Sequence, residues 1–152
     1  MVLADGTNCI MQLWSVPGQD KYCTQRPMYY RNAAAAIVCF DITNEQSFTI
    51  MKKWVEELKQ NVSSEQFVLA IACNKADLES SRVISRSRAE QFAQRVNAIL
   101  YETSAKENFG VEKIFKKITE DVSILILIVC MKLVLKMVLL LKTSLNRSLK
   151  DP

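Results

Sequence analysis

Two runs of the sequence are almost wholly apolar and too short to be typical buried helices. They are residues 34–42 (AAAIVCFDI) and 67–73 (FVLAIAC). Continuous apolar runs of this length are typical of parallel strands that are covered on both faces of a sheet. We also expect strands at residues 98–103 (AILYET) and at residues 8–14 (NCIMQLW), the latter in a hairpin that turns at an Asp-Gly pair, residues 5–6.

Segments with apolar residues at helical spacing lie between or after these strands. The first begins with a capping box at residues 43–46 (TNEQ), the second begins near Ser87, and the third follows Gly110. The alternation predicts an α/β fold with a mostly parallel sheet flanked by helices. The expected buried faces are Phe48, Met51, Val55 and Leu58 in the first helix, Ala89, Phe92, Ala93 and Val96 in the second, and Val111, Ile114, Phe115 and Ile118 in the third.

The composition excludes several classes of active site. The chain has no histidine, which removes Ser-His and Cys-His nucleophilic arrangements and the commonest zinc ligand. Its five cysteines are scattered and never form a C-x-x-C pair, so we expect buried free thiols and no metal site. No apolar signal segment opens the chain, which favours a cytosolic location.

The last part of the chain differs from the rest. Residues 1–121 hold 15 Lys+Arg and 15 Asp+Glu, whereas residues 122–152 hold 5 Lys+Arg and one Asp. Residues 122–141 are apolar except for Ser123, Lys132 and Lys136, and they have the length of a membrane-spanning helix. Two central lysines at roughly +2.5 to +3.5 kcal/mol each make membrane insertion marginal.

We therefore expect an apolar and basic extension at residues 122–152 after a folded domain at residues 1–121. Its apolar part is predicted to form a long helix, which either continues the last helix or contacts a membrane. A further alternative is that the ILILIV stretch at residues 124–129 fills a gap in the sheet. Nothing in the charge pattern favours nucleic acid as a partner.

Two polar motifs follow predicted strands. Asn74-Lys75-Ala76-Asp77 comes directly after residues 67–73, and Thr103-Ser104-Ala105-Lys106 comes about 27 residues later, after the strand at 98–103. The carboxyl ends of parallel strands meet at one edge of a sheet, where open α/β sheets bind their ligands. The two motifs are therefore expected to form one binding site.

In this order, N-K-x-D and S-A-K resemble the guanine-reading motifs of small GTPases. The segments PMYYRNAAAAIVCFDITNEQSF and KKWVEELKQNV resemble the Rab family, with the early-endosomal branch as the nearest group. The resemblance covers residues 1–121 and implies a P-loop-NTPase-like small G domain that binds GTP or GDP. It also implies a role in vesicle and endosomal transport at the cytoplasmic face of endosomal membranes, with Rab effectors or regulators as partners.

The chemistry of these motifs suits guanine. The carboxylate of Asp77 can accept from two neighbouring N–H groups of guanine, which adenine does not present, and each such bond contributes roughly 1.5–3 kcal/mol. The alternative is a solvated turn in which Asn74 and Asp77 only cap the next element. The resemblance implies the other roles. Asn74 would tie the two loops together and contact the base, and the stems of Lys75 and Lys106 would cover the ring faces. The N–H of Ala105 would donate to the guanine oxygen, and Ser104 belongs to the same loop.

The phosphate-binding half of such a site is not recognisable. A P-loop requires G-x-x-x-x-G-K-[ST], and none of the three glycines of the chain (Gly6, Gly18 and Gly110) lies in such a motif. The first strand, phosphate loop, first helix and metal-binding threonine of the family would precede Met1. We therefore expect an incomplete sheet with unpaired edges at residues 8–14 and 34–42, and doubtful Mg²⁺ binding.

The segment WSVPGQDKY at residues 14–22 resembles the family pattern W-D-T-A-G-Q-E. Ser15 stands where the family has the Asp that helps to hold Mg²⁺, and Pro17 stiffens the turn. Gly18, whose N–H would meet the γ-phosphate, and Gln19, which would orient the attacking water, are retained. We expect Gln19 to be idle and GTP hydrolysis to be absent.

Trp14 and Tyr29 match two aromatic residues with which Rab proteins bind effectors, and they are equally consistent with half-buried packing. Two classes of function follow. The first is a Rab-like guanine-nucleotide-binding protein of membrane transport with weakened phosphate and Mg²⁺ binding. The second is a nucleotide-independent interaction or decoy module that uses Trp14, Tyr29, the switch II region and the helix of residues 46–60. A truncated or misread product without function is a third possibility.

Overall fold

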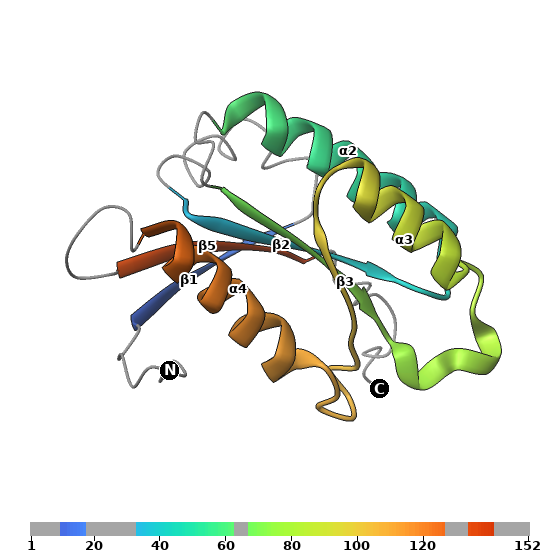
Figure 1. The fold of residues 1–152 in the computed structure, drawn as a ribbon. Coiled ribbons are helices and arrows are strands. Elements are labelled where there is room, and N and C mark those ends of the chain that lie inside the picture. Colours follow the sequence, from blue (N-terminus) through green and yellow to red (C-terminus); the bar gives the residue numbers. More distant parts are fainter. Residues whose placement is uncertain (1–9, 18–32, 63–66, 127–133, 142–152) are drawn as a thin grey trace, which may run out of the picture.

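The computed structural model describes residues 10–17, 33–62, 67–126 and 134–141 (Figure 1). The predicted α/β fold is confirmed, with strands that alternate with helices along most of the chain. The elements are β1 (Ile10–Pro17), β2 (Ala35–Asp41), α2 (Glu45–Asn61), β3 (Val68–Asn74), the 3-10 helix η2 (Ala76–Ser81), α3 (Arg86–Arg95), β4 (Ile99–Glu102), α4 (Val111–Ile126) and β5 (Val134–Leu141).

The strands form one parallel sheet in the order β1-β5-β2-β3-β4. Among strands β2, β3 and β4, the longest pairing joins β2 to β3, from Ala35 opposite Val68 to Asp41 opposite Asn74. Helices α2 and α3 cover one face of the sheet and α4 covers the other (Figure 1). Because all five strands run in the same direction, their carboxyl ends lie along one edge.

Burial on both faces explains why the strand sequences are continuously apolar. Successive side chains of β2 point to opposite faces. Val38 and Phe40 pack beneath α2 and α3, whereas Ile37 packs against α4. The rings of Phe40 and Phe48 meet edge-to-face at 4.9 Å between centroids, and Phe92 of α3 continues the stack at 5.9 Å from Phe48.

The starts of α2 and α3 differ by one residue from the predicted ones, whereas α4 begins directly after Gly110, as predicted. Asn44, not Thr43, caps α2, because its Oδ1 accepts a hydrogen bond from the backbone N–H of Ser47 at 3.0 Å. Ser85 caps α3 in the same way, by accepting from the N–H of Arg88. The predicted buried faces of α2 and α3 are confirmed, except that Val96 is the half-buried C-cap of α3.

Two cysteines lie in the described strands, and both are free thiols. Cys73 is buried and Cys39 is half-buried. Burial raises the pKa of each thiol to about 12, so both remain protonated at neutral pH. Cys9, Cys23 and Cys130 lie outside the described residues.

The predicted long apolar helix over residues 122–141 is wrong. Helix α4 ends at Ile126, and residues 134–141 form the strand β5. This strand pairs with the whole of β1, from Ile10 opposite Val134 to Pro17 opposite Leu141, and it also pairs with β2 from Ala35 to Val38. In the described part of the chain, no helix is both long and apolar enough to cross a membrane.

The expected unpaired edges of β1 and β2 are consequently absent where β5 lies between them. The apolar tail does fill the gap, but with residues 134–141. The prediction that residues 124–129 fill it is wrong for residues 124–126, which belong to α4, and residues 127–129 lie outside the described residues. Unpaired buried backbone groups cost about 1–3 kcal/mol each, so a strand that pairs on both sides stabilises the sheet. The remainder of the predicted hairpin, residues 1–9, lies outside the described residues.

Replacing Leu139 by proline tests the role of β5. Leu139 lies opposite Ser15 of β1 and Ile37 of β2. Proline removes a backbone N–H from a central strand, so Leu139→Pro should lower the free energy of unfolding by at least about 1–3 kcal/mol. Chemical denaturation measures this change, and hydrogen exchange in β1 and β2 should accelerate. Leu139→Val keeps the N–H and should have a much smaller effect; equal stability of the two variants would contradict the pairing.

Candidate functional site

The two predicted guanine loops lie together at the carboxyl edge of the sheet. Asn74 ends β3, and residues 103–105 follow β4. The N–H of Thr103 donates to the carbonyl of Cys73 at 2.9 Å, and the N–H of Ala76 donates to the carbonyl of Thr103 at 3.0 Å. The expectation that the two motifs are neighbours in space is therefore confirmed.

Asn74 joins the two loops through its side chain. Its Oδ1 accepts hydrogen bonds from the backbone N–H of Ala105 at 3.3 Å and from the hydroxyl of Thr103 at 3.5 Å. This agrees with the linking role expected from the sequence. A contact between Asn74 and a base stays a prediction.

Asp77 and Ser104 form a second link between the loops. The hydroxyl of Ser104 donates to Oδ1 of Asp77 at 2.6 Å and accepts from the N–H of Glu107 at 3.1 Å. Ser104 is buried and Asp77 is exposed. Within the described ranges no group donates to Oδ2 of Asp77. The carboxylate is thus fixed on one side and able to accept hydrogen bonds on the other.

Lys75 connects the first loop to β2. Its backbone is left-handed (φ 65°), and its Nζ lies 2.6 Å from Oδ2 of Asp41, the last residue of β2. Asp41 also accepts from the N–H and the hydroxyl of Thr43. Burial raises the pKa of Asp41, but the bonds from Lys75 and Thr43 outweigh it and hold the pKa below its ordinary value. Asp41 was not among the predicted site residues, although a single carboxylate in an apolar strand was the available signal.

Gly110 allows the second loop to close. Ser104 and Phe109 exchange backbone hydrogen bonds of 2.9 and 3.0 Å, and Gly110 then returns the chain to α4 with φ +72°. A Cβ atom at Gly110 would lie 2.1 Å from the carbonyl oxygen of Glu102, which is too close for any side chain. Lys106 lies exposed in this loop, with its Nζ 3.6 Å from a carboxylate oxygen of Glu107.

The residues expected to contact a phosphate or an effector are only partly described. Gly18, Gln19 and Tyr29 lie outside the described residues, and β1 ends at Pro17. Trp14 and its neighbour Leu13 are 45% and 53% exposed. Among the residues that the structure describes, no three His, Cys, Asp or Glu side chains lie close enough together to hold a metal ion.

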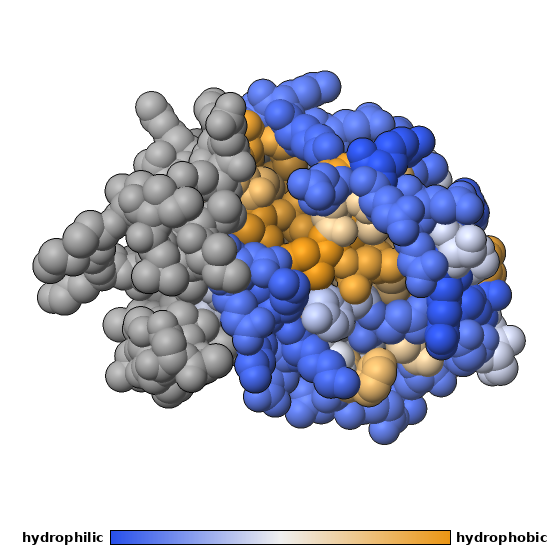
Figure 2. Space-filling model, in the orientation of Figure 1, coloured by the Kyte–Doolittle hydropathy of each residue, from blue (hydrophilic) through white to orange (hydrophobic). Residues whose placement is uncertain are grey.

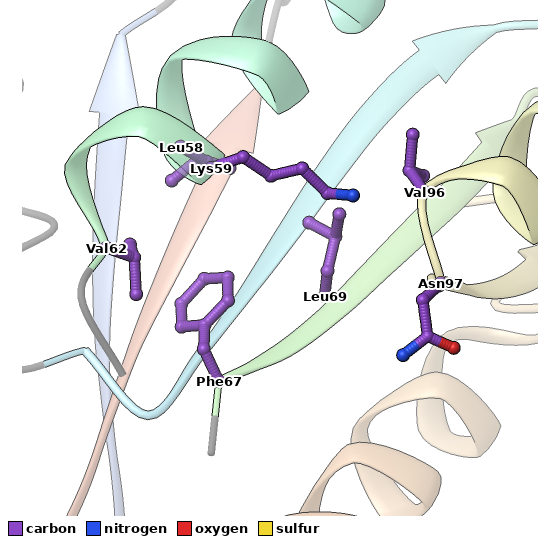
Figure 3. A pocket seen from close by; sticks show the side chains of 7 residues that line it. All are labelled: Leu58, Lys59, Val62, Phe67, Leu69, Val96 and Asn97. Carbon is purple, nitrogen blue, oxygen red and sulfur yellow. The ribbon is translucent and has the colours of Figure 1, made fainter. Parts of the chain in front are cut away.

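A small cavity lies at the opposite end of β3 from Asn74. Its volume is about 210 Å³, and its walls come from the end of α2, the start of β3 and the end of α3 (Figure 3). Figure 2 shows apolar residues at the surface between the polar helices in the same region. The cavity takes no part in the guanine loops. Its lining residues are Leu58, Lys59, Val62, Phe67, Leu69, Val96 and Asn97.

Comparison with known proteins gives a consistent result. A family model described as "Ras family" matches residues 1–124. Ras-related protein RabJ of Dictyostelium discoideum is 42% identical over 114 residues, which are 75% of this chain and 44% of the relative. Ras-related protein Rab-31 of Homo sapiens is 41% identical over 110 residues (72% and 56%), and Ras-related protein RABF2a of Arabidopsis thaliana is 47% identical over 109 residues (72% and 54%). The chain spans about half the length of these curated relatives.

Replacing Gly110 by alanine should disturb the loop of residues 103–109. Both the positive φ and the contact with the carbonyl of Glu102 oppose a side chain. We expect Gly110→Ala to lower the free energy of unfolding by more than about 1 kcal/mol and to shift the NMR signal of the Ala105 amide. Asn108→Gly, at a neighbouring residue with φ 50°, is the matched control and should leave both unchanged or slightly increase stability. An unshifted Ala105 amide in Gly110→Ala would contradict the tight closure.

The contact between Asp41 and Lys75 should make stability depend on acid pH. The pKa of Asp41 is lower in the folded state than in the unfolded state. Its contribution to the free energy of unfolding is therefore complete above the unfolded-state pKa, near 3.9, and is lost as the pH falls through the folded-state pKa. Asp41→Asn should remove this part of the pH dependence. Urea denaturation from pH 6 downwards measures it, with Asp121→Asn as a control on α4. Identical pH profiles for wild type and Asp41→Asn would contradict this explanation.

Proposed function

The chain belongs to the Ras family of small GTPases, among the Rab proteins, and we propose that it recognises a guanine base while its phosphate and Mg²⁺ contacts are lost. Asp77 would accept from the two adjacent N–H groups of guanine. The observation that supports this most directly is the pair of links that joins the loops, from Ser104 to Asp77 and from Ala105 to Asn74.

The geometry leaves the required groups available for a base. Oδ1 of Asp77 is held by Ser104, and the residue as a whole is exposed to solvent. The N–H of Ala105 makes a long bond of 3.3 Å to Asn74, so it is the proposed donor to the guanine oxygen. The stems of Lys75, held at its tip by Asp41, and of Lys106 are proposed to cover the ring faces.

Strand β5 supports the proposed loss of phosphate binding. Residues 136–143 (KMVLLLKT) end in Lys-Thr, the pair with which a P-loop motif can end. Lys136 and Leu141, however, stand where that motif requires glycine. A P-loop surrounds phosphate with free backbone N–H groups. Residues 136–141 instead pair with β1, and residues 137–140 also pair with β2, so their backbone is engaged in the sheet. Ser15 further removes the carboxylate that a Mg²⁺ site needs.

The proposed domain organisation follows from this. We keep the division into a G-domain-like body, residues 1–121, and an extension, residues 122–152, as a proposal. The two are continuous in the fold, because α4 runs across this boundary to Ile126 and the extension supplies β5 to the sheet. We propose a Rab-type role in vesicle transport at the cytoplasmic face of endosomal membranes. Effectors or regulators would bind through Trp14, Tyr29 and the switch II region, and Gln19 with Gly18 would have no γ-phosphate on which to act.

A nucleotide-independent interaction module is the second candidate. The exposure of Trp14 on β1 favours it, because aromatic side chains are enriched at protein interfaces. Partner binding that is unaffected by guanosine and by Asp77→Ala, but lost in Trp14→Ala, would support this candidate over the first.

Titration with nucleosides tests the proposed function. Guanosine should shift the NMR signals of Asn74 and Ala105, adenosine should not, and GDP with Mg²⁺ should bind only a few-fold tighter than guanosine. Asp77→Ala should weaken guanosine binding by roughly tenfold or more, because a bond to a charged group is lost. Asp121→Ala, which removes a carboxylate on α4, is the control. Absence of guanosine shifts would contradict base recognition; GDP binding roughly a hundredfold tighter would contradict the loss of phosphate contacts.

A further inference from the structure

The 3-10 helix η2, which carries Asp77, is not held by packing. None of its residues is buried, and its dihedral angles depart from helical values at Leu78 (φ −98°, ψ 39°). Its N-cap residue, Lys75, makes no side-chain capping hydrogen bond. The position of Asp77 therefore depends on polar links between η2 and its surroundings.

Arg82 makes the most extensive of these links. Its side chain is only 10% exposed and lies between two carboxylates. Its Nε donates to Glu79 at 3.0 Å, its Nη2 donates to Glu79 at 2.7 Å and to Glu102 at 2.8 Å, and its Nη1 donates to the carbonyl of Ile84 at 3.1 Å. Arg86 lies 3.6 Å from Glu79 and 3.4 Å from Glu102, but its side chain is 61% exposed.

The two carboxylates belong to the segments that form the guanine loops. Glu79 lies in η2, two residues after Asp77, and Glu102 ends β4, two residues before Ser104. Arg82 thus joins the same two segments as the bond between Ser104 and Asp77. A guanidinium can bond two carboxylates at once through its fork of N–H groups, which a lysine ammonium cannot do with the same geometry.

We propose that Arg82 is a positioning residue for guanine recognition, which holds η2 against β4 so that Asp77 can reach both N–H groups of the base. This inference rests on the proposed function. It concerns the second of the two hydrogen bonds, to the exocyclic amino group of guanine. A displaced η2 keeps the carboxylate near the base but separates one oxygen from its donor.

Comparison of guanosine with inosine distinguishes positioning from general stability. Inosine has the same ring N–H and oxygen as guanosine but lacks the exocyclic amino group. A variant that only lowers the folded fraction weakens both nucleosides equally and leaves the ratio of their dissociation constants unchanged. A variant that displaces Asp77 lowers the preference for guanosine.

The experiment is an NMR titration of the full chain with each nucleoside. The wild type should prefer guanosine by roughly tenfold or more, as one bond to a charged group implies. Arg82→Met should reduce this ratio to nearly one, and Arg82→Lys should give an intermediate value. Arg88→Met is the matched control, because Arg88 makes a similar fork to Glu45, at 2.7 and 2.5 Å, between α3 and α2. Its ratio should equal that of the wild type.

An unchanged ratio in folded Arg82→Met overturns the inference. If Arg82→Met does not fold, Glu102→Gln takes its place, since it weakens the link to β4 and leaves the link to Glu79; an unchanged ratio in that variant is equally decisive. Wild-type protein that binds neither nucleoside overturns the proposed function together with this inference, whereas a wild-type preference that survives in Arg82→Met overturns this inference alone.

Discussion

The parallel pairing of β5 with β1 and β2 is the interaction on which the completeness of the sheet depends. In the described part of the chain, β1 has no other strand partner, so its place in the sheet is fixed through β5. A side-chain contact reinforces this arrangement, since the hydroxyl of the buried Thr119 in α4 lies 3.4 Å from the sulfur of Met11 in β1. Residues 10–17 and 134–141, which are far apart in the sequence, therefore stabilise one another at one side of the sheet.

The half of the molecule that carries the proposed guanine loops is organised differently. Strands β2, β3 and β4 with α2 and α3 share a core that includes Phe40, Phe48 and Phe92, and the guanine loops leave this core at its carboxyl edge. The neighbouring position that would lead into a phosphate loop is occupied by a strand with an engaged backbone. The proposed base site and the position of a phosphate loop thus lie in different segments, which is why the proposed function retains one without the other.

The sequence predicted this half well because its signals are local. Apolar runs identified β2 and β3, and the two motifs identified loops that meet at the sheet edge. Residues 134–141 were assigned to a helix because a continuous apolar run has no periodicity, and the edges that it pairs with are distant in sequence. The cap of α2 was misplaced because Thr43 and Asn44 are both good capping residues. Asp41 and Arg82 were missed because their roles depend on partners that only the folded chain brings near.

The guanine loops depend on hydrogen bonds and ion pairs more than on packing. Each link contributes only about 0.5–1.5 kcal/mol net, or about 1.5–3 kcal/mol where a charge takes part, whereas fully burying one large apolar side chain contributes about 1.5–3 kcal/mol. The core is built from many such side chains, and η2 contains none. Loss of one polar link should therefore move Asp77 without unfolding the body. The proposed recognition and the stability of the body therefore depend on different interactions, so a substitution at Arg82 can change the first while most of the second remains.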